Sequence, residues 1–260
     1  MELKLEKLSY KDILKNIDYE FSEGKITSVM SSSGKGKTIL SYLISGIEKP
    51  TSGTIINSYQ GREIGYIFQN AEESFIFNTV REELIFGLKR YNYKLDNIVK
   101  RIEDSLKMVE LPLEYLDRNP FELSSGEKEL LSLAVTLSLN PKLIIIDDPT
   151  TYLDNKKEEY LIKLLKKLKK NYNKTIIIFS NDIEFITKVT DNYLLLKNGK
   201  IYSEGNNKDL LNSGDKLKKA GIEVPKIIDF ISDVKKKKNI DLESTFDIKE
   251  LMKDIYRNVK

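Results

Sequence analysis

The fold of this chain is decided by one stretch of sequence, Ile26-Thr-Ser-Val-Met-Ser-Ser-Ser-Gly-Lys-Gly-Lys-Thr-Ile-Leu40. Its apolar first part, residues 26–30, predicts a buried strand, and the apolar residues after Thr38 recur with helical spacing. A strand, a tight loop containing glycine and a helix start form the setting of a phosphate-binding loop. Successive backbone N–H groups of such a loop surround an anion, and the helix N-terminus adds further donors.

Two side chains of this stretch suit phosphate chemistry. Lys37 would reach the β- and γ-phosphates of a nucleotide, and the Thr38 hydroxyl would bind Mg²⁺. One position departs from the pattern, because Ser31 replaces its first glycine and a Cβ resists positive φ. The alternative is a strand-to-helix turn that is rich in serine, glycine and lysine and binds no ligand. The predicted nucleotide-binding residues of the stretch are Ser31, Ser32, Ser33, Gly34, Lys35, Gly36, Lys37, Thr38 and Ile39.

The composition excludes several classes of chemistry. The 260 residues include neither cysteine nor histidine, so disulfides, thiol nucleophiles and a Ser-His-Asp triad are all excluded. Any general base must therefore be a carboxylate or another group. Charged residues make up 32% of the chain and nearly cancel, at a net charge of +3. This balance does not indicate nucleic-acid binding, and we expect no nucleic-acid partner.

The sequence also bears on location. Its first residues alternate charged and apolar side chains, which is unlike a signal peptide. Apolar runs such as residues 143–146 are far shorter than the roughly 18 residues of a membrane span. We therefore expect a cytoplasmic protein whose membrane contact, if any, is peripheral.

Strand and helix patterns alternate along the chain. Apolar runs without alternation, at residues 143–146 and 175–179, are typical of central parallel strands. Two short strands around residues 3–8 and 17–21 predict a small sheet, and further strands are expected around residues 54–57 and 65–68. Asn198-Gly199 predicts a two-residue hairpin. We therefore predict an α/β fold with a mostly parallel sheet.

The remaining segments are predicted to be helical. Apolar residues keep a helical period over residues 95–109, and an apolar helix follows Leu123-Ser-Ser-Gly-Glu127. After about residue 205 the chain becomes rich in lysine and lacks long apolar strands. We predict a first domain over residues 1–205, which includes a helical subdomain at about 70–138, and a helical extension over residues 206–260.

The motifs, taken in order, resemble ATP-binding-cassette (ABC) ATPases over residues 1–205. Along the chain, these motifs are the phosphate loop, Gln69, the Leu123-Ser-Ser-Gly-Glu127 stretch, the 143–148 strand with two carboxylates, Thr151-Tyr-Leu-Asp154, and Ser180-Asn181-Asp182. The resemblance implies a P-loop NTPase (RecA-like) core with a mostly parallel sheet. It also implies a small antiparallel β subdomain, a helical signature subdomain and a helical C-terminal extension.

The resemblance further implies ATP and Mg²⁺ as cofactors and assigns roles to individual residues. Thr38, Gln69 and Asp147 would serve Mg²⁺. Asp148, Gln69 and Asn181 would form the catalytic set, in which Asp148 activates the attacking water. Ser124, Ser125 and Gly126 resemble the signature that caps the ATP of a second ATPase subunit in a head-to-tail dimer, homo- or heterodimeric. Tyr10 would either stack on adenine or pack in the sheet.

A narrower resemblance concerns the ATPases of energy-coupling-factor importers. Residues 69–77, 79–87 and 217–225 are similar to segments of that group. The group imports vitamins or cobalt and nickel ions, and its ATPases work with integral membrane coupling and substrate-binding subunits. The resemblance thus implies a peripheral protein at the cytoplasmic face of the membrane. The alternative within the same fold is an ABC ATPase without a transport role.

Four positions depart from the family pattern: Ser31 and Ser125 replace glycines, Asp148 replaces glutamate, and Asn181 replaces histidine. A catalytic group displaced by about an ångström can lose about 10²-fold in rate. We therefore expect this chain to bind ATP and hydrolyse it slowly while its signature serves a more active partner. A nucleotide-binding subunit without useful hydrolysis is the alternative.

Overall fold

The computed structural model describes residues 2–32, 34–238 and 248–258. Its central sheet has six strands in the order β5-β6-β7-β3-β8-β9. All neighbours in this sheet pair in parallel except β8 and β9, which are antiparallel. This confirms the predicted mostly parallel core. The strands are β3 (Ile26–Ser31), β5 (Ile64–Ile67), β6 (Leu143–Asp147), β7 (Thr175–Phe179), β8 (Asn192–Lys197) and β9 (Lys200–Asn206).

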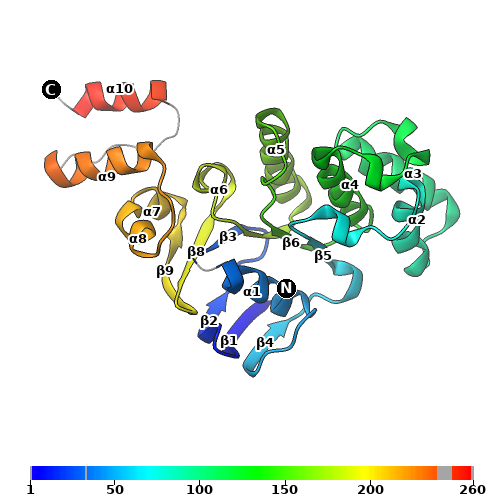
Figure 1. Cartoon of the computed structure of the whole chain (residues 1–260), viewed down its shortest axis with the longest axis horizontal. Coiled ribbons are helices and arrows are strands. Elements are labelled where there is room, and N and C mark those ends of the chain that lie inside the picture. The colour runs from blue at the N-terminus through cyan, green and yellow to red at the C-terminus, as the bar shows by residue number, and fades with distance from the viewer. Residues whose placement is uncertain (1, 33, 239–247, 259–260) are drawn as a thin grey trace.

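Both faces of the central sheet are covered (Figure 1). Every residue of β6 and β7 is buried, which explains why their sequences show no alternation. In β6, Ile144 and Ile146 belong to the core on one face, and Leu143 and Ile145 belong to the core on the other. Successive side chains of a strand point to opposite faces, so one apolar run supplies two cores.

A smaller antiparallel sheet packs on one side of the central sheet together with α1 (Gly34–Ser45). Its strand order is β2-β1-β4, with β1 at Leu3–Tyr10, β2 at Leu14–Glu20 and β4 at Ser52–Asn57. The sheet and α1 share one core, because Leu5 and Leu8 of β1 cluster with Leu40 and Leu43 of α1. The predicted small antiparallel subdomain is confirmed.

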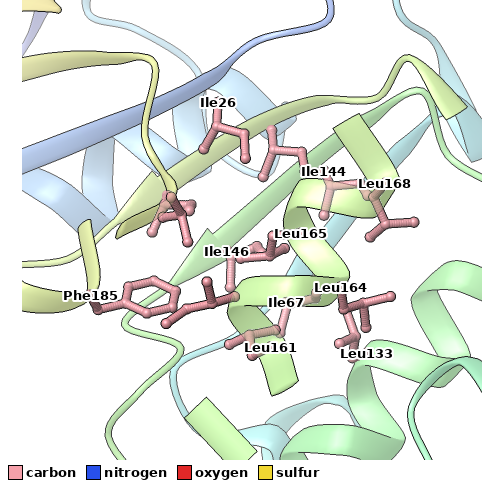
Figure 2. Close-up of a cluster of buried hydrophobic side chains, with 14 of the residues drawn as sticks. Ile26, Ile67, Leu133, Ile144, Ile146, Leu161, Leu164, Leu165, Leu168 and Phe185 are labelled. Carbon is pink, nitrogen blue, oxygen red and sulfur yellow. The ribbon is translucent and has the colours of Figure 1, made fainter. Parts of the chain in front are cut away.

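Helices α4, α5 and α6 cover the other face. Figure 2 shows how Leu161, Leu164, Leu165 and Leu168 of α5 pack toward strand residues such as Ile146. The spacing of these leucines places them on one face of the helix. The bounds are Ser125–Ser138 for α4, Asn155–Tyr172 for α5 and Ile183–Val189 for α6.

The predicted helical subdomain contains α2 (Val80–Arg90) and α3 (Leu95–Met108), which pack with α4. Thr79 caps α2 by accepting a hydrogen bond from the Glu82 N–H, as its position before the helix predicts. Short 3-10 turns connect these parts at Gly61–Glu63, Ala71–Ser74, Leu113–Asp117 and Pro120–Glu122.

The C-terminal extension is helical, as predicted, and its first part is joined closely to the rest. Leu210, Leu217, Ile222 and Ile228 belong to the same core as Ile144 of β6. The division between residues 205 and 206 therefore stays a prediction, since one continuous core crosses it. The helices are α7 (Asn207–Leu211), α8 (Gly214–Lys219), α9 (Lys226–Lys238) and α10 (Ile248–Asn258).

Candidate functional site

The predicted phosphate loop lies at the carboxyl ends of the parallel strands, where ligands bind in open α/β sheets. Strand β3 ends at Ser31 and α1 begins at Gly34, so a strand, a loop and a helix follow one another as predicted. Of the predicted loop residues, Ser33 lies outside the described part of the chain. Lys37, in the first turn of α1, is 5% exposed. An ammonium group at this depth requires negative charge nearby, and two carboxylates supply it.

Asp147 is the first of these carboxylates and is 2% exposed at the end of β6. The Thr38 hydroxyl donates to its Oδ2 over 2.9 Å, whereas no donor within residues 2–32, 34–238 and 248–258 reaches its buried Oδ1. Burial raises the pKa of Asp147 to about 6, the Thr38 hydrogen bond opposes that rise, and the charge of Asp148 adds to it. A hydroxyl beside a carboxylate with an unpaired oxygen suits a hard divalent cation such as Mg²⁺.

Asp148 is the second carboxylate, and its Oδ2 lies 3.6 Å from the Lys37 ammonium nitrogen. The residue has φ +41°, in the left-handed region that aspartate adopts more readily than most residues. Its backbone N–H donates to the Phe179 carbonyl over 2.8 Å, and the Thr151 hydroxyl donates to its carbonyl over 3.1 Å. These contacts fix the sharp exit from β6 and hold the carboxylate beside the loop lysine.

Gln69 and Asn181 lie at the same edge of the sheet. Gln69 comes soon after β5, whose Ile67 pairs with Ile146 of β6, and its side chain is exposed. The Asn181 amide bonds to the end of β3: its Oδ1 accepts from the Ser31 N–H over 3.1 Å, and its Nδ2 donates to the Ser31 carbonyl over 2.8 Å. The structure thus directs Asn181 toward the backbone of the phosphate loop.

The predicted signature residues lie at the start of α4. Ser124 is the N-cap, and both its N–H and its hydroxyl donate to Glu127 Oε2, over 2.8 and 2.6 Å. These two bonds are the main reason that the pKa of Glu127 is lowered. Ser125 is exposed and Gly126 is buried, and a Cβ on Gly126 would lie 2.7 Å from the Lys157 ammonium nitrogen. A side chain at this position would therefore require the flexible end of Lys157 to shift.

The predicted site residues therefore form two separate groups in the structure. In the first group, an ion pair connects Lys37 with Asp148, and hydrogen bonds connect Thr38 with Asp147 and Ser31 with Asn181. In the second group, Ser125 lines a cavity of about 230 Å³ together with Asn70, Ala71 and Glu72 of the loop after β5. No hydrogen bond or ion pair within the described ranges joins the signature residues to the predicted phosphate loop. The Tyr10 ring, 7% exposed, packs in the core of the small sheet.

Three neighbours of the predicted signature residues were missed by sequence reasoning. Glu127 had a signal, because Ser124 followed three residues later by glutamate is a capping-box pattern. Lys157 and Glu129 had no such signal. Lys157 lies far from the signature in the sequence, and Glu129 is a charged residue directly before the apolar run of α4. Burial raises the pKa of Glu129 to about 7, and a hydrogen bond from the Ala71 backbone opposes the rise.

Comparison with known proteins gives consistent matches. The profile of the ABC transporter family matches residues 14–151. An energy-coupling factor transporter ATP-binding protein, EcfA2 of Clostridium acetobutylicum, is 29% identical over 99% of this chain and 98% of its own. The structure of cbiO1 from Clostridium perfringens, part of the ABC transporter complex cbiONQ, matches with a TM-score of 0.74 at 28% identity, covering 88% of this chain and 97% of that one. A dimeric post-hydrolysis structure of the cassette MJ0796 with ADP and Pi matches with a TM-score of 0.70 at 29% identity, covering 78% and 98%.

Proposed function

The chain belongs to the ABC transporter family of ATPases, and we propose that it energises a membrane importer of the energy-coupling-factor type by binding and hydrolysing ATP. The importer class is supported by the near full-length similarity to EcfA2 and to cbiO1. We propose a vitamin or a metal ion as cargo, as the resemblance of the sequence to energy-coupling-factor ATPases implies. In this proposal the membrane subunits select the cargo, because the site described above consists of phosphate-binding groups.

One observation carries the proposal: the groups that phosphoryl transfer requires meet at one edge of the sheet. Lys37 lies 3.6 Å from Asp148, and Thr38 donates to Asp147. Lys37 and the loop N–H groups would neutralise the charge of the β- and γ-phosphates. Asp148, at the carboxyl end of β6, would orient the attacking water and accept its proton.

Thr38, Asp147 and Gln69 are proposed to hold Mg²⁺, directly or through water. The fit rests on the unpaired, buried Oδ1 of Asp147 and on the adjacent Thr38 hydroxyl. Bound Mg²⁺ supplies positive charge against the phosphate oxygens. A deprotonated Asp147 is the form that would accept the ion, so burial, which favours the protonated form, would be offset on binding.

A second ATPase subunit is proposed to complete the site. Ser124, Ser125 and Gly126 stand at the N-terminus of α4, where N–H groups favour an anion, yet they belong to a group of contacts separate from this chain's own phosphate loop. A head-to-tail pair would bring the signature of one subunit to the ATP of the other. The dimeric structure of the similar cassette MJ0796 supports the pairing of two subunits.

Membrane partners are proposed to dock on an aromatic patch formed by Ile76, Phe86 and Phe121. These side chains are 71%, 47% and 44% exposed. The two residues next to Ile76 in sequence contact the two phenylalanines: Phe77 contacts Phe86 with ring centroids 5.1 Å apart, and Phe75 contacts Phe121 at 6.1 Å. Exposed clusters of large apolar side chains mark interaction sites.

We also propose that the protein acts as a peripheral subunit at the cytoplasmic face of the membrane. Across the described ranges of the chain, no helix is both long and apolar enough to span a bilayer. Attachment would therefore depend on the membrane subunits.

A catalytically weak, nucleotide-binding subunit is the second candidate. It is favoured by the Asp148 side chain, which is one carbon shorter than glutamate and lies beside Lys37. A carboxylate placed short of the attacking water loses rate without losing affinity for ATP.

The test is to purify the full chain and to measure Mg-ATP affinity and turnover for it and for Lys37→Ala. We expect the variant to bind Mg-ATP about 10- to 100-fold more weakly, the loss expected when a charged hydrogen bond is removed. Lys200→Ala is the control, because Lys200 is exposed at the start of β9. Unchanged affinity in Lys37→Ala, or no affinity in the unmodified chain, would overturn the proposal. Turnover near 10 s⁻¹, typical of enzymes, would reject the weak-subunit alternative.

A further inference from the structure

Asn181 joins two strands at the point where the phosphate loop begins. Its amide accepts from the Ser31 N–H over 3.1 Å and donates to the Ser31 carbonyl over 2.8 Å. We propose that Asn181 is a positioning residue, which holds the first turn of the phosphate loop through the Ser31 backbone. This inference rests on the proposed function, because it assigns how the same site holds its nucleotide.

The hydrogen-bond ladder of the sheet supports this role. Strands β3 and β7 pair in parallel, and the last backbone bond of the ladder runs from the Ser180 N–H to the Val29 carbonyl, over 3.1 Å. The next two bonds would join Ser31 to backbone groups around Ser180, but the Asp182 N–H is bonded to the Ser180 hydroxyl. The Asn181 side chain supplies both missing bonds. It thus extends the sheet by one step after the β7 backbone has turned away.

Burial makes these bonds difficult to exchange. Ser31 is 3% exposed, so water cannot readily replace Asn181 as the partner of its backbone groups. If the amide turned to bring both of its polar atoms toward a phosphate, both bonds to Ser31 would break. The structure therefore favours an Asn181 side chain that stays bonded to the Ser31 backbone and does not turn toward the nucleotide.

A histidine cannot take over this role. Its two ring nitrogens point in different directions, so a single imidazole cannot both accept from and donate to one residue as an amide does. Asn181→His would therefore release the end of β3, although it restores the residue that ABC ATPases have at this position.

The role predicts a specific pattern of affinities. The loop that starts at Ser31 would bind the β-phosphate, which ATP and ADP share, as well as the γ-phosphate. Loosening the loop therefore weakens both nucleotides by the same factor. A residue that contacts only the γ-phosphate would change the affinity for ATP alone.

The experiment compares Asn181→Ala and Asn181→His with the unmodified full chain, by titration with Mg-ATP and with Mg-ADP. We expect both variants to lose about five- to tenfold in affinity for each nucleotide, the size expected for one or two hydrogen bonds, with the ATP-to-ADP ratio unchanged. Asn212→Ala is the control, because the Asn212 amide donates locally, to the Lys208 carbonyl on α7. A loss for ATP alone, or ATP binding retained in Asn181→His, would overturn the proposal.

Hydrogen exchange of the Ser31 amide, measured without nucleotide, tests the same contact independently. We expect faster exchange in both Asn181 variants and unchanged exchange in Asn212→Ala. Unchanged exchange in the Asn181 variants contradicts the positioning role even if the proposed function holds. An unmodified chain that binds neither nucleotide is a different result, which overturns the proposed function and this inference together.

Discussion

Asp148 lies closest to the proposed chemistry. Its backbone is fixed by φ +41° and by the hydrogen bond to the Phe179 carbonyl, so only the side chain can adjust its reach. A glutamate at this position would extend one carbon farther from the same backbone. The added length would move the carboxylate by about an ångström, a displacement that can change the rate of a catalytic step by about 10²-fold.

We therefore predict that Asp148→Glu raises ATP turnover, by about tenfold or more. Steady-state ATPase assays at saturating Mg-ATP measure the change, and Mg-ATP affinity should stay within a few-fold of the unmodified chain. Asp12→Glu is the matched control, because Asp12 lies exposed in the turn after β1. Equal turnover in both variants would mean that carboxylate length does not limit the reaction.

Some contacts of individual residues could be predicted from the sequence, and others could not. The pairing of Thr38 with Asp147 follows from topology, because carboxyl ends of parallel strands meet at one edge and the predicted loop starts there. The contacts of Asn181 do not follow from it. An asparagine after a strand can turn toward a ligand or toward the backbone, and only the three-dimensional path of β7 decides between them.

At the scale of elements, the turn between α8 and α9 lies against the phosphate loop. A Cβ on Gly221 would be 3.2 Å from the Ser32 Cβ, and Gly221 has φ +77°. The turn is held firmly, since Leu217 and Ile222 on either side of it are buried in the main core. Sequence periodicity predicted helices in this extension but not their contact with the loop, because periodicity reports which face is apolar and not what covers it.

This contact predicts that Gly221→Ala weakens Mg-ATP binding by about three- to tenfold, because overpacking would push Ser32 and shift the loop. Gly46→Ala is a matched control: Gly46 has φ +80° and nothing lies within 4 Å of its Cβ position, so backbone strain is similar without a clash. Adding Ser32→Gly to Gly221→Ala should restore affinity. Titration with Mg-ATP measures all three, and equal affinity in the two alanine variants would contradict the prediction.

At the scale of the whole molecule, the aromatic patch lies on elements other than those that carry the predicted phosphate-binding group. The patch is held in place by Glu83 of α2, whose carboxylate accepts from the Ile76 N–H and, over 2.6 Å, from the Phe77 N–H. Glu83 is 5% exposed, and burial raises its pKa while these two bonds oppose the rise. The loop that follows Gln69 is thus fixed to α2, so a partner on the patch would contact an element that leads directly to the site.

We predict that replacing two residues of the patch together, with Ile76→Ser and Phe86→Ser, abolishes co-purification of integral membrane proteins from detergent-solubilised membranes. The stability of the chain should change by only about 0.5 kcal/mol per site, as is usual for surface substitutions. ATP binding should be retained, because neither side chain belongs to the phosphate-binding group. Tyr202→Ser is the control, since Tyr202 is 41% exposed on β9, outside the patch. Mass spectrometry identifies the membrane proteins that co-purify with each variant. If the double variant retains them at the level of the Tyr202→Ser control, the docking surface lies elsewhere.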